Sequence, residues 1–550
     1  MVLLRLVCAS QIVLFSAVAA WCQEVAVTPV SGSGSDPSAS RPQVQQIAIA
    51  VRPQTWSASL AKWKQHRESQ GIKVIELDAE LGRDGIQAAV VSQHKVAPEQ
   101  IRFVVLCGDV GTTPTTIPTF YRPSTALVQF GGDKQLATDV PYADVDGDDL
   151  PDLAIGRIPA DTANQLADYL DRVIAYERST DFTAWRRNVH VVAGVGGFGP
   201  VADSMIEMTT RKFLGDRIPG WTRVTMTQAS AESHYCPSPV HFAENTIDRI
   251  NEGGLFWVYI GHGHIETLDR MRLEQSYLPI FDVNRLPNVD ASGRPPISIF
   301  LACYTGATDA SRDSLAERFV LKPEGSIAAV AASRISGPYG LAMLSNGMLS
   351  GFYEHHIPSL GEIVLFAKRE SAKELDSAAL SSDLKMIDSI AQAMSPKDYD
   401  LLAERIEHVW QVQLIGDPTL QMPYPHILEL NAPKRAVPGQ ELAISGIDVL
   451  VGELTLELTY RRTDKRRDLG AIDSHWTTPE GQRQYRDRYL AANHGVISST
   501  TTTVAEDGTF QATLDVPVDL GRGRYSIRAV GAADGQWQAG YTEISVRPPR

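Results

Sequence analysis

The fold class that the sequence predicts is α/β, with a parallel sheet covered by helices and a small β-sandwich after it. Up to residue 425, short apolar runs typical of buried strands alternate with segments of helical periodicity. Strands that alternate with helices favour a parallel sheet with helices on both faces. From residue 427 the helical period disappears, and strands of alternating polarity are separated by turn residues, which is typical of a sandwich.

The first 45 residues precede every predicted strand. Residues 1–20 contain Arg5, an apolar stretch and the small residues AVAA, the pattern of a secretory signal peptide. That stretch is short for a bilayer core of about 30 Å. Residues 21–45 are rich in Ser, Gly and Pro and predict a disordered linker. We expect an exported protein, secreted, periplasmic or on the cell surface, with no integral membrane segment in the mature chain.

Two tandem α/β subdomains are expected, over residues 46–150 and 151–425. In the first, the predicted strands are QIAIAV, IKVIELD and IRFVVLCGD, with helical segments between them. In the second, the predicted strands are NVHVVAGVGG, WTRVTMT, GLFWVYIG, ISIFLAC and GSIAAVAAS. Its predicted helices are TANQLADYLDRVIAYER, AENTIDRINEG and segments near 202–215, 341–355 and 398–410.

The predicted sandwich covers residues 427–550, with strands LELTYRR, TFQATLDVPV, GRGRYSIRAVG and YTEISVRP. A polar insertion, 463–497, separates its strands, and the sequence predicts no role for it. The net charge of −14 argues against nucleic acid as a partner. Five cysteines in 550 residues are too few and too scattered for a disulfide scaffold.

Two predicted strands end in reactive side chains. FWVYIG is followed by His262 and Gly263, and ISIFLA is followed by Cys303. The carboxyl ends of parallel strands meet at one edge of a sheet, and a thiol nucleophile needs a base nearby. A glycine there brings the backbone close to a substrate, so that the N–H groups of Gly263 and Cys303 face a developing oxyanion. A buried, inert cysteine is the alternative for Cys303 alone, and the conjunction with His-Gly favours catalysis.

At these residues the sequence resembles the gingipain family, in the cysteine peptidase clan of caspases and legumains. YIGHGHIET and IFLACYTG carry the resemblance, and LAKWKQHRESQGIKV, VVLCGD, TDVPYADVDGDDLPDLAIGRIPA, VIAYER and LIGDPTLQMP extend it over residues 46–424. It implies a caspase-like catalytic region of two subdomains and an immunoglobulin-like domain after it. It also implies a cysteine endopeptidase of proteins or peptides, with Cys303 as nucleophile and His262 as general acid/base.

Two features of the catalytic pair stay open in the sequence. His264 shares a strand face with His262 and is a rival base, but Ile265 rather than glycine follows it. Arginine-specific gingipains place a supporting acid where this chain has Val195. Either the pair works as a dyad, with Glu266 or Asp269 orienting the imidazole, or turnover is weaker.

A carboxylate for substrate selection is suggested by the same resemblance. Asp203 falls where arginine-specific gingipains place the acid that pairs with the substrate guanidinium. Cleavage after arginine is the resulting hypothesis. The alternative is an ordinary aspartate near a helix N-terminus.

The stretch DVDGDDLPD spaces carboxylates as calcium loops do. Its candidate calcium ligands are Asp144, Asp146, Asp148 and Asp152. Asp149 stands where such loops prefer glycine, and a solvated acidic turn is the alternative. No catalytic metal or organic cofactor is expected, because the glycines of VVAGVGGFGP lack dinucleotide-binding spacing and the histidines lack a zinc motif.

Two rival functions remain. A sortase-like transpeptidase of the same family transfers the acyl group to an amine instead of water. A catalytically weak surface-binding protein uses its C-terminal domain to hold a cell-surface partner.

Overall fold

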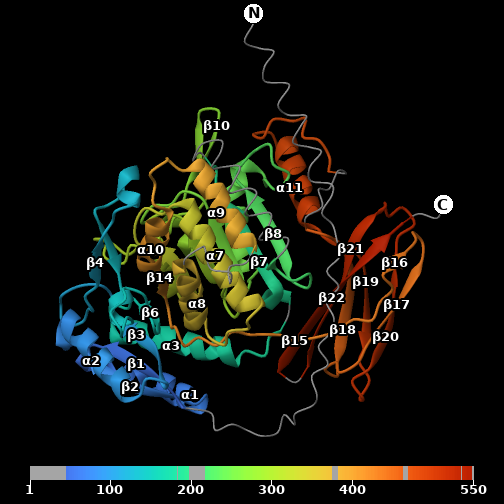
Figure 1. Ribbon diagram of the computed structural model, residues 1–550. Coiled ribbons are helices and arrows are strands. Elements are labelled where there is room, and N and C mark those ends of the chain that lie inside the picture. The colour runs from blue at the N-terminus through green and yellow to red at the C-terminus, as the bar shows by residue number, and fades with distance from the viewer. Residues whose placement is uncertain are drawn as a thin grey trace, which may run out of the picture. The chain divides into compact units, whose positions relative to one another are not determined.

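The computed structural model describes residues 45–182, 184–196, 217–373, 382–462, 469–533 and 535–547. Its main feature is a ten-stranded sheet (Figure 1). In spatial order the strands are β2 (Ile72–Asp78), β1 (Gln46–Arg52), β3 (Ile101–Cys107), β6 (Ala154–Ile158), β14 (Val412–Ile415), β13 (Ala328–Ala332), β12 (Ile297–Leu301), β9 (Phe256–Ile260), β7 (Asn188–Ala193) and β8 (Arg223–Gln228).

The sheet consists of two parallel halves that run in opposite directions. Strands β2, β1, β3, β6 and β14 are parallel to one another, and so are β13, β12, β9, β7 and β8. The antiparallel pair β13–β14 joins the halves. The sequence predicts a parallel sheet and its strands, but not this reversal. Strand β6 lies after the boundary expected at residue 150, yet it pairs with β3.

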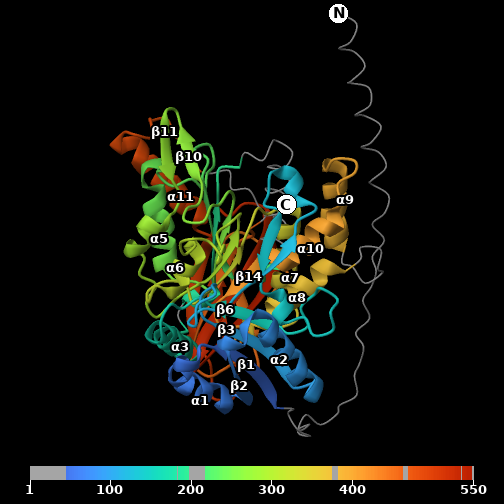
Figure 2. The ribbon, with the colours of Figure 1, turned by 90° about the vertical axis from the view of Figure 1, so that its left-hand side faces the viewer.

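Helices cover both faces of the sheet. They are α1 (Ala61–Ser69), α2 (Gly82–Val96), α3 (Ala163–Arg178), α5 (Phe242–Asn251), α6 (Leu315–Leu321), α7 (Pro338–Tyr353), α8 (Leu360–Ala372), α9 (Ser382–Met394) and α10 (Leu401–Gln411). Figure 2 shows α3, α5 and α6 to one side of the sheet and α7, α8 and α10 to the other. Helix α3 is typical: the Thr162 hydroxyl caps it by accepting from the Gln165 N–H, and Leu166, Leu170 and Val173 are buried.

Two hairpins extend from this region: β4 (Phe120–Pro123) with β5 (Gln135–Thr138), and β10 (Arg270–Leu273) with β11 (Ser276–Pro279). The second projects beyond the sheet in Figures 1 and 2. It follows directly on the predicted His262 segment.

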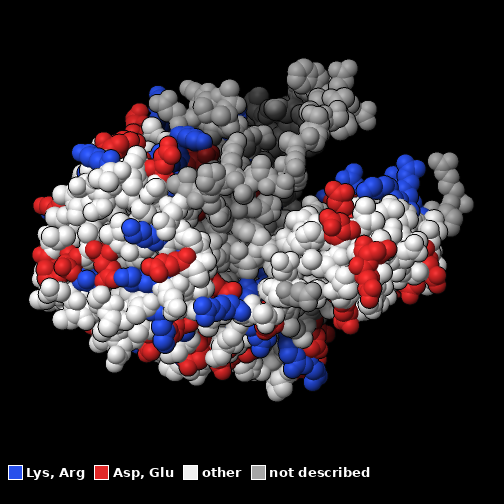
Figure 3. Space-filling view, turned by 90° about the horizontal axis from the view of Figure 1, so that it is seen from below, with Lys and Arg blue, Asp and Glu red and all other residues white. Residues whose placement is uncertain are grey.

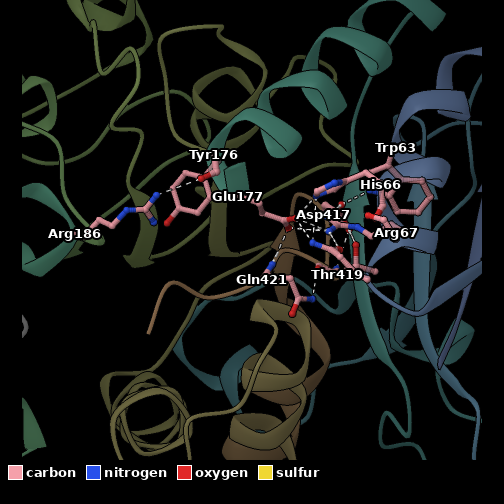
Figure 4. A network of polar contacts seen from close by, with 11 residues as sticks. Trp63, His66, Arg67, Tyr176, Glu177, Arg186, Asp417, Thr419 and Gln421 are labelled. Carbon is pink, nitrogen blue, oxygen red and sulfur yellow. Dashed lines mark hydrogen bonds and ion pairs between the residues drawn. The ribbon is translucent and has the colours of Figure 1, made fainter. Parts of the chain in front are cut away.

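A buried network of charges ties α1 and α3 to the segment after β14 (Figure 4). The Asp417 carboxylate accepts from the Trp63 indole N–H at 2.6 Å and from the Arg67 guanidinium at 2.8 Å. Arg67 also donates to Glu177 at 2.8 Å, and Glu177 accepts from the Gln421 N–H at 2.9 Å. Because each charge has an opposite partner, the network is stable where a lone charge would be costly.

The C-terminal region has two β-sheets, as predicted for an immunoglobulin-like sandwich. One sheet contains β15 (His426–Ile427), β22 (Gln536–Val546), β21 (Gly523–Ala533), β18 (Glu453–Tyr460) and β19 (Val496–Thr503), with β16 (Arg435–Ala436) also on β22. The other pairs β17 (Glu441–Gly446) with β20 (Phe510–Asp515). Apolar side chains such as Leu442, Leu456 and Ile527 form the core between them.

The insertion in the sandwich contains helix α11 (Pro479–Asn493), which the sequence analysis does not predict. The Tyr489 hydroxyl bonds to the Thr227 hydroxyl at 2.8 Å. The Asn493 amide accepts from the Met226 N–H at 2.7 Å and donates to the Met226 carbonyl at 3.0 Å. Helix α11 therefore occupies hydrogen-bonding groups of β8, the edge strand of the large sheet.

Charges of both signs are interspersed over the face of the α/β region seen in Figure 3. Within the ranges described above, no helix is long and apolar enough to cross a bilayer. The predicted signal peptide, the linker up to residue 44 and the helix expected near 202–215 lie outside the described residues.

Candidate active site

The predicted catalytic residues follow two strands that lie side by side. Strands β9 and β12 are parallel and hydrogen-bonded, with Ile260 opposite Leu301. His262 and Cys303 each come two residues later in the chain. The structure therefore places both at neighbouring carboxyl ends of one sheet, where reactive groups of α/β proteins collect.

Gly263 packs against the backbone of the cysteine segment. A Cβ atom built there would lie 2.7 Å from the Cys303 carbonyl oxygen and 2.8 Å from the Ala302 Cβ. Side chains do not approach backbone atoms so closely. A glycine at this position lets the His262 segment lie directly on the Cys303 segment, and its backbone also bridges Leu268.

The sulfur of Cys303 is partly exposed and contacts the backbone of Ser336. The Ser336 N–H points at Sγ with a nitrogen to sulfur distance of 3.3 Å, and the Ser336 carbonyl oxygen lies 3.8 Å away. Burial raises the pKa of the Cys303 thiol, and the Ser336 N–H acts in the opposite direction. Burial therefore favours the thiol form of Cys303. Sequence reasoning missed Ser336, because its contact is made by backbone atoms alone.

The residue after the cysteine is held in an uncommon conformation. Tyr304 has a φ of 58°, in the left-handed region that non-glycine residues seldom adopt. Its hydroxyl donates to Asp133 at 2.9 Å, and its N–H donates to the Arg334 carbonyl at 3.1 Å. Arg334 in turn donates to Asp309 at 2.8 Å. These contacts fix the backbone next to Cys303.

Helix α6 connects the His262 segment with the Cys303 segment. Its Leu315 N–H donates to the Ile265 carbonyl at 2.6 Å, and its Ala316 N–H donates to the Thr305 carbonyl at 3.0 Å. The first N–H groups of a helix have no partner within the helix, so these carbonyls satisfy them. One helix end therefore sets the spacing between the segment that carries His262 and the segment that carries Cys303.

The two histidines differ in their surroundings. His262 is partly buried, and its carbonyl accepts from the Tyr259 hydroxyl at 2.9 Å. His264 is exposed, and its N–H donates to the Thr267 carbonyl at 2.8 Å. The buried strand thus anchors the backbone of His262, while the side chain of His264 lies in solvent.

The two candidate orienting acids also differ. Glu266 pairs with Arg312 at 3.0 Å and with Arg318 at 3.8 Å. Asp269 accepts from the Arg270 N–H through Oδ1, while its buried Oδ2 has no hydrogen-bond partner among the described residues. Asp269 is therefore the acid with an oxygen available for a further donor.

The predicted calcium loop brings three of its four carboxylates together. Oxygens of Asp144, Asp146 and Asp152 lie within 4.8 Å of one another, and Asp148 is not part of this group. Asp149 has a φ of 66°, so it adopts the left-handed conformation that glycine usually supplies in such loops. Asp152 also pairs with Arg369. The predicted specificity residue Asp203 lies outside the described residues.

Comparisons with known proteins agree with these observations. Residues 40–423, more than half of the chain, match the sequence profile of peptidase family C25. A search of the curated proteins gives no match to this sequence. One similar solved structure is the crystal structure of the Arg-specific cysteine proteinase gingipain R (RgpB), with a TM-score of 0.52, 15% identity, and coverage of 92% of this chain and 98% of that chain.

Two further structures have a similar fold. The complex of Porphyromonas gingivalis RgpB pro- and mature domains has a TM-score of 0.52 and 15% identity, over 91% of this chain and 100% of that chain. A structure described only as a protease has a TM-score of 0.53 and 14% identity, over 91% and 97%. At these identities the structures support the fold, while the profile match carries the assignment to a family.

Proposed function

The chain belongs to peptidase family C25, the gingipain family, and is therefore a cysteine peptidase; from this premise we propose that Cys303 and His262 are its catalytic pair. The observation that carries the proposal is the register of β9 and β12, which puts both residues at adjacent strand ends. Asp269 is proposed as the acid that orients the imidazole, because its Oδ2 is buried and available.

The proposed reaction begins from the neutral thiol. Cys303 attacks the scissile carbonyl carbon while His262 takes the thiol proton, and the carbonyl oxygen becomes an oxyanion facing the N–H groups of Gly263 and Cys303. The intermediate collapses to an acyl-thioester, and His262 gives its proton to the leaving amine. Water then attacks the thioester with His262 as base, which releases the acid and restores the thiol.

The decisive test compares single substitutions of the two histidines. A peptidyl electrophile that alkylates the active cysteine should label the wild type and should not label Cys303→Ala. His262→Ala should lose about 100-fold or more in kcat/KM, the usual contribution of a general acid/base. His264→Ala serves as the matched control and should keep most activity. Equal losses for His262→Ala and His264→Ala would contradict the assignment.

The proposed substrate is a protein or peptide, which the enzyme cleaves at an internal peptide bond after an arginine. This preference rests on the position of Asp203 in the family resemblance. Arginyl and neutral peptide substrates should differ in kcat/KM for the wild type, and Asp203→Ala should reduce the ratio by lowering the arginyl value. An unchanged ratio would overturn the preference while leaving the catalytic pair standing.

Export is also proposed, on the strength of the N-terminal signal pattern of residues 1–20. Cell fractionation of the producing organism tests it. The mature protein should be found outside the cytoplasm, with an N-terminus near Ala20. Full-length protein retained in the cytoplasm would contradict export.

Structural calcium is proposed at the loop of Asp144, Asp146 and Asp152. Burial and the neighbouring carboxylates raise the pKa of Asp148, which is the effect of crowded negative charge that a cation relieves. Calcium should raise the melting temperature of the wild type, and Asp144→Asn should abolish the increase. A chelator that leaves melting unchanged, together with no calorimetric binding of calcium, would contradict the proposal.

A further inference from the structure

A second site lies apart from the catalytic pair, where the sandwich packs on the α/β region. A cavity of about 800 Å³ is lined by the start of β8, the end of α11 and strands β18, β21 and β22. Its walls include five arginines: Arg223, Arg249, Arg461, Arg462 and Arg528. The whole chain carries a net charge of −14, so this concentration of positive charge needs a reason.

Carboxylates neutralise only part of this charge. Arg223 and Arg249 share one acid, Glu252, at 2.5 and 2.6 Å. Arg528 pairs with Glu457 at 2.5 Å, but Glu457 also pairs with Arg187 at 3.0 Å. In each group two guanidinium ions therefore share one carboxylate.

Arg461 and Arg462 complete the wall. Arg461 lies 3.2 Å from Glu543, a side chain that is 47% exposed. Arg462 has no carboxylate partner among the described residues: it donates through Nη2 to the carbonyls of Ile218 and Pro219. Its Nη1 is buried and has no hydrogen-bond partner in this part of the chain. The cavity wall thus includes a guanidinium group with no carboxylate partner among the described residues.

The pKa values report the same crowding. Burial lowers the pKa of Arg462 to about 10, and the positive charge of Arg528 acts in the same direction. Burial also lowers the pKa of Arg528, with Arg187 and Arg223 contributing repulsion. An anion placed between these groups would reduce the repulsion between the guanidinium charges.

The rest of the wall suits a small organic ligand. The Tyr541 ring packs on Gly220, where an added Cβ would lie 2.4 Å from a ring carbon. Thr459 and Ser526 also belong to the lining, and the Thr459 hydroxyl donates to the Ser526 carbonyl at 3.3 Å. A volume of about 800 Å³ falls within the range of small-molecule sites, and it exceeds what a bare inorganic ion fills.

We propose that this cavity binds a small sugar carrying a phosphate or sulfate group, with Arg462 as its principal anion contact. Guanidinium groups bind tetrahedral oxyanions through paired hydrogen bonds, and such ligands provide the negative charge that the cavity lacks. Tyr541 would face the sugar. Because Arg223 and Arg249 belong to the α/β region and Arg462 and Arg528 to the sandwich, the ligand would link the two regions.

The experiment measures binding to the full chain by calorimetry and thermal melting. The probes are glucose 1-phosphate, glucose 6-sulfate and unmodified glucose. At least one charged sugar should bind at a single site and raise the melting temperature by mass action, with an affinity that falls as salt rises. The stronger of the two identifies the group that the site prefers. No binding of either at about 10 mM, or equal binding of glucose, would overturn the proposal.

Three variants test the assignment of residues. Arg462→Gln should weaken binding about tenfold or more. Arg524→Gln removes one positive charge from an exposed position of β21 and should leave binding unchanged. Glu543→Gln removes a negative charge from the wall and should tighten binding, so the test does not depend on a variant that fails to fold. Binding that is unchanged in Arg462→Gln and in Glu543→Gln would contradict the site.

Discussion

At the scale of single residues, the surroundings of Cys303 come from segments far apart in the sequence. A Cβ atom added at Gly263 would lie 2.7 Å from the Cys303 carbonyl oxygen. The backbone nitrogen of Ser336 lies 3.3 Å from the Cys303 sulfur. Cys303 is therefore held by backbone atoms, which keep their positions when nearby side chains change. Burial favours the thiol of Cys303 over its thiolate.

The raised pKa of Cys303 predicts how its alkylation depends on pH. Iodoacetamide should label the resting protein with a rate that still increases above about pH 9, beyond the ordinary range of a free thiol. Mass spectrometry after digestion identifies the labelled residue. Burial also raises the pKa of Cys236 to about 12, so it should stay unlabelled in the folded protein. A labelling rate that levels off near neutral pH would show a preformed thiolate and contradict the prediction.

Glu317 is a second residue with a measurable pH effect. It is 2% exposed, and the Ser314 N–H donates to its Oε2 at 2.7 Å. Burial and the charge of Asp109 raise the pKa of Glu317 well above its ordinary value, and Asp313 adds to this repulsion. Arg157 faces Asp109 from the sheet. The folded protein thus favours the protonated form of Glu317 more strongly than the unfolded chain does.

We expect Glu317→Gln to gain stability relative to the wild type as the pH rises from about 5 to about 8. In this window the unfolded wild type binds fewer protons than the folded protein, so its free energy of unfolding falls with rising pH. Glutamine keeps both an acceptor for Ser314 and a donor for Asp109, and it does not titrate. Urea unfolding at several pH values measures the difference, with the exposed Glu99→Gln as control. A difference that does not change with pH would contradict this account.

At the scale of elements, α11 protects the open edge of the large sheet. Unpaired N–H and C=O groups of an edge strand attract other strands, and Asn493 occupies both groups of Met226 in β8. The polar insertion thus has a structural role, because its helix α11 occupies backbone groups of the edge strand β8.

Asn493→Ala should therefore lower the free energy of unfolding by about 1–3 kcal/mol, because it leaves partly buried backbone groups without partners. Thermal melting and light scattering measure the loss of stability and any association through the edge. Asp487→Ala changes an exposed residue of the same helix and should have an effect below about 0.5 kcal/mol. Equal effects of the two substitutions would show that α11 does not act through the edge of β8.

The elements that the sequence predicts are those with a strong local signal. QIAIAV and IKVIELD become β1 and β2, because strands buried on both faces are nearly continuous apolar runs. The direction of a strand leaves no such signal in the sequence. The short strand β14, with the sequence VQLI, therefore did not reveal that it pairs antiparallel with β13. Helix α11 has few apolar residues, and its large buried side chains are Tyr485 and Tyr489. Its sequence therefore lacks the apolar pattern that predicts a helix.

The same limit applies to the candidate site. His262 and Cys303 were predictable, because each follows an apolar strand and their types suit catalysis. Ser336 and Leu315 contribute backbone N–H groups, which every residue possesses, so no residue type signals them. Asp269 is a better candidate than Glu266 for the orienting acid, because Glu266 forms an ion pair with Arg312 while Oδ2 of Asp269 has no hydrogen-bond partner among the described residues.

At the scale of the whole molecule, the charge network around Asp417 joins segments that are about 350 residues apart in sequence. Trp63 and Arg67 come from the first helix, and Asp417 follows the strand that joins the two halves of the sheet. Its contacts are fully buried, so water cannot replace a missing partner.

Asp417→Asn should destabilise the protein by about 3–5 kcal/mol, because it leaves the buried Arg67 without part of its charge compensation. Urea unfolding provides the measurement. Asp171→Asn is the matched control, since the Lys62–Asp171 pair also links α1 to α3 but is exposed, and it should cost less than about 1 kcal/mol. Similar losses of stability in both variants would contradict the prediction that the buried network contributes more to stability than the exposed ion pair.

The reversal between β13 and β14 has a consequence for synthesis of the chain. Strand β14 pairs with β6 on one side and β13 on the other, and it is the last strand of the large sheet to leave the ribosome. Until Val412–Ile415 emerge, β6 and β13 are open edges of two incomplete sheets. A chain truncated before Val412 would carry both edges permanently and would be prone to join with other copies, even though it contains His262 and Cys303.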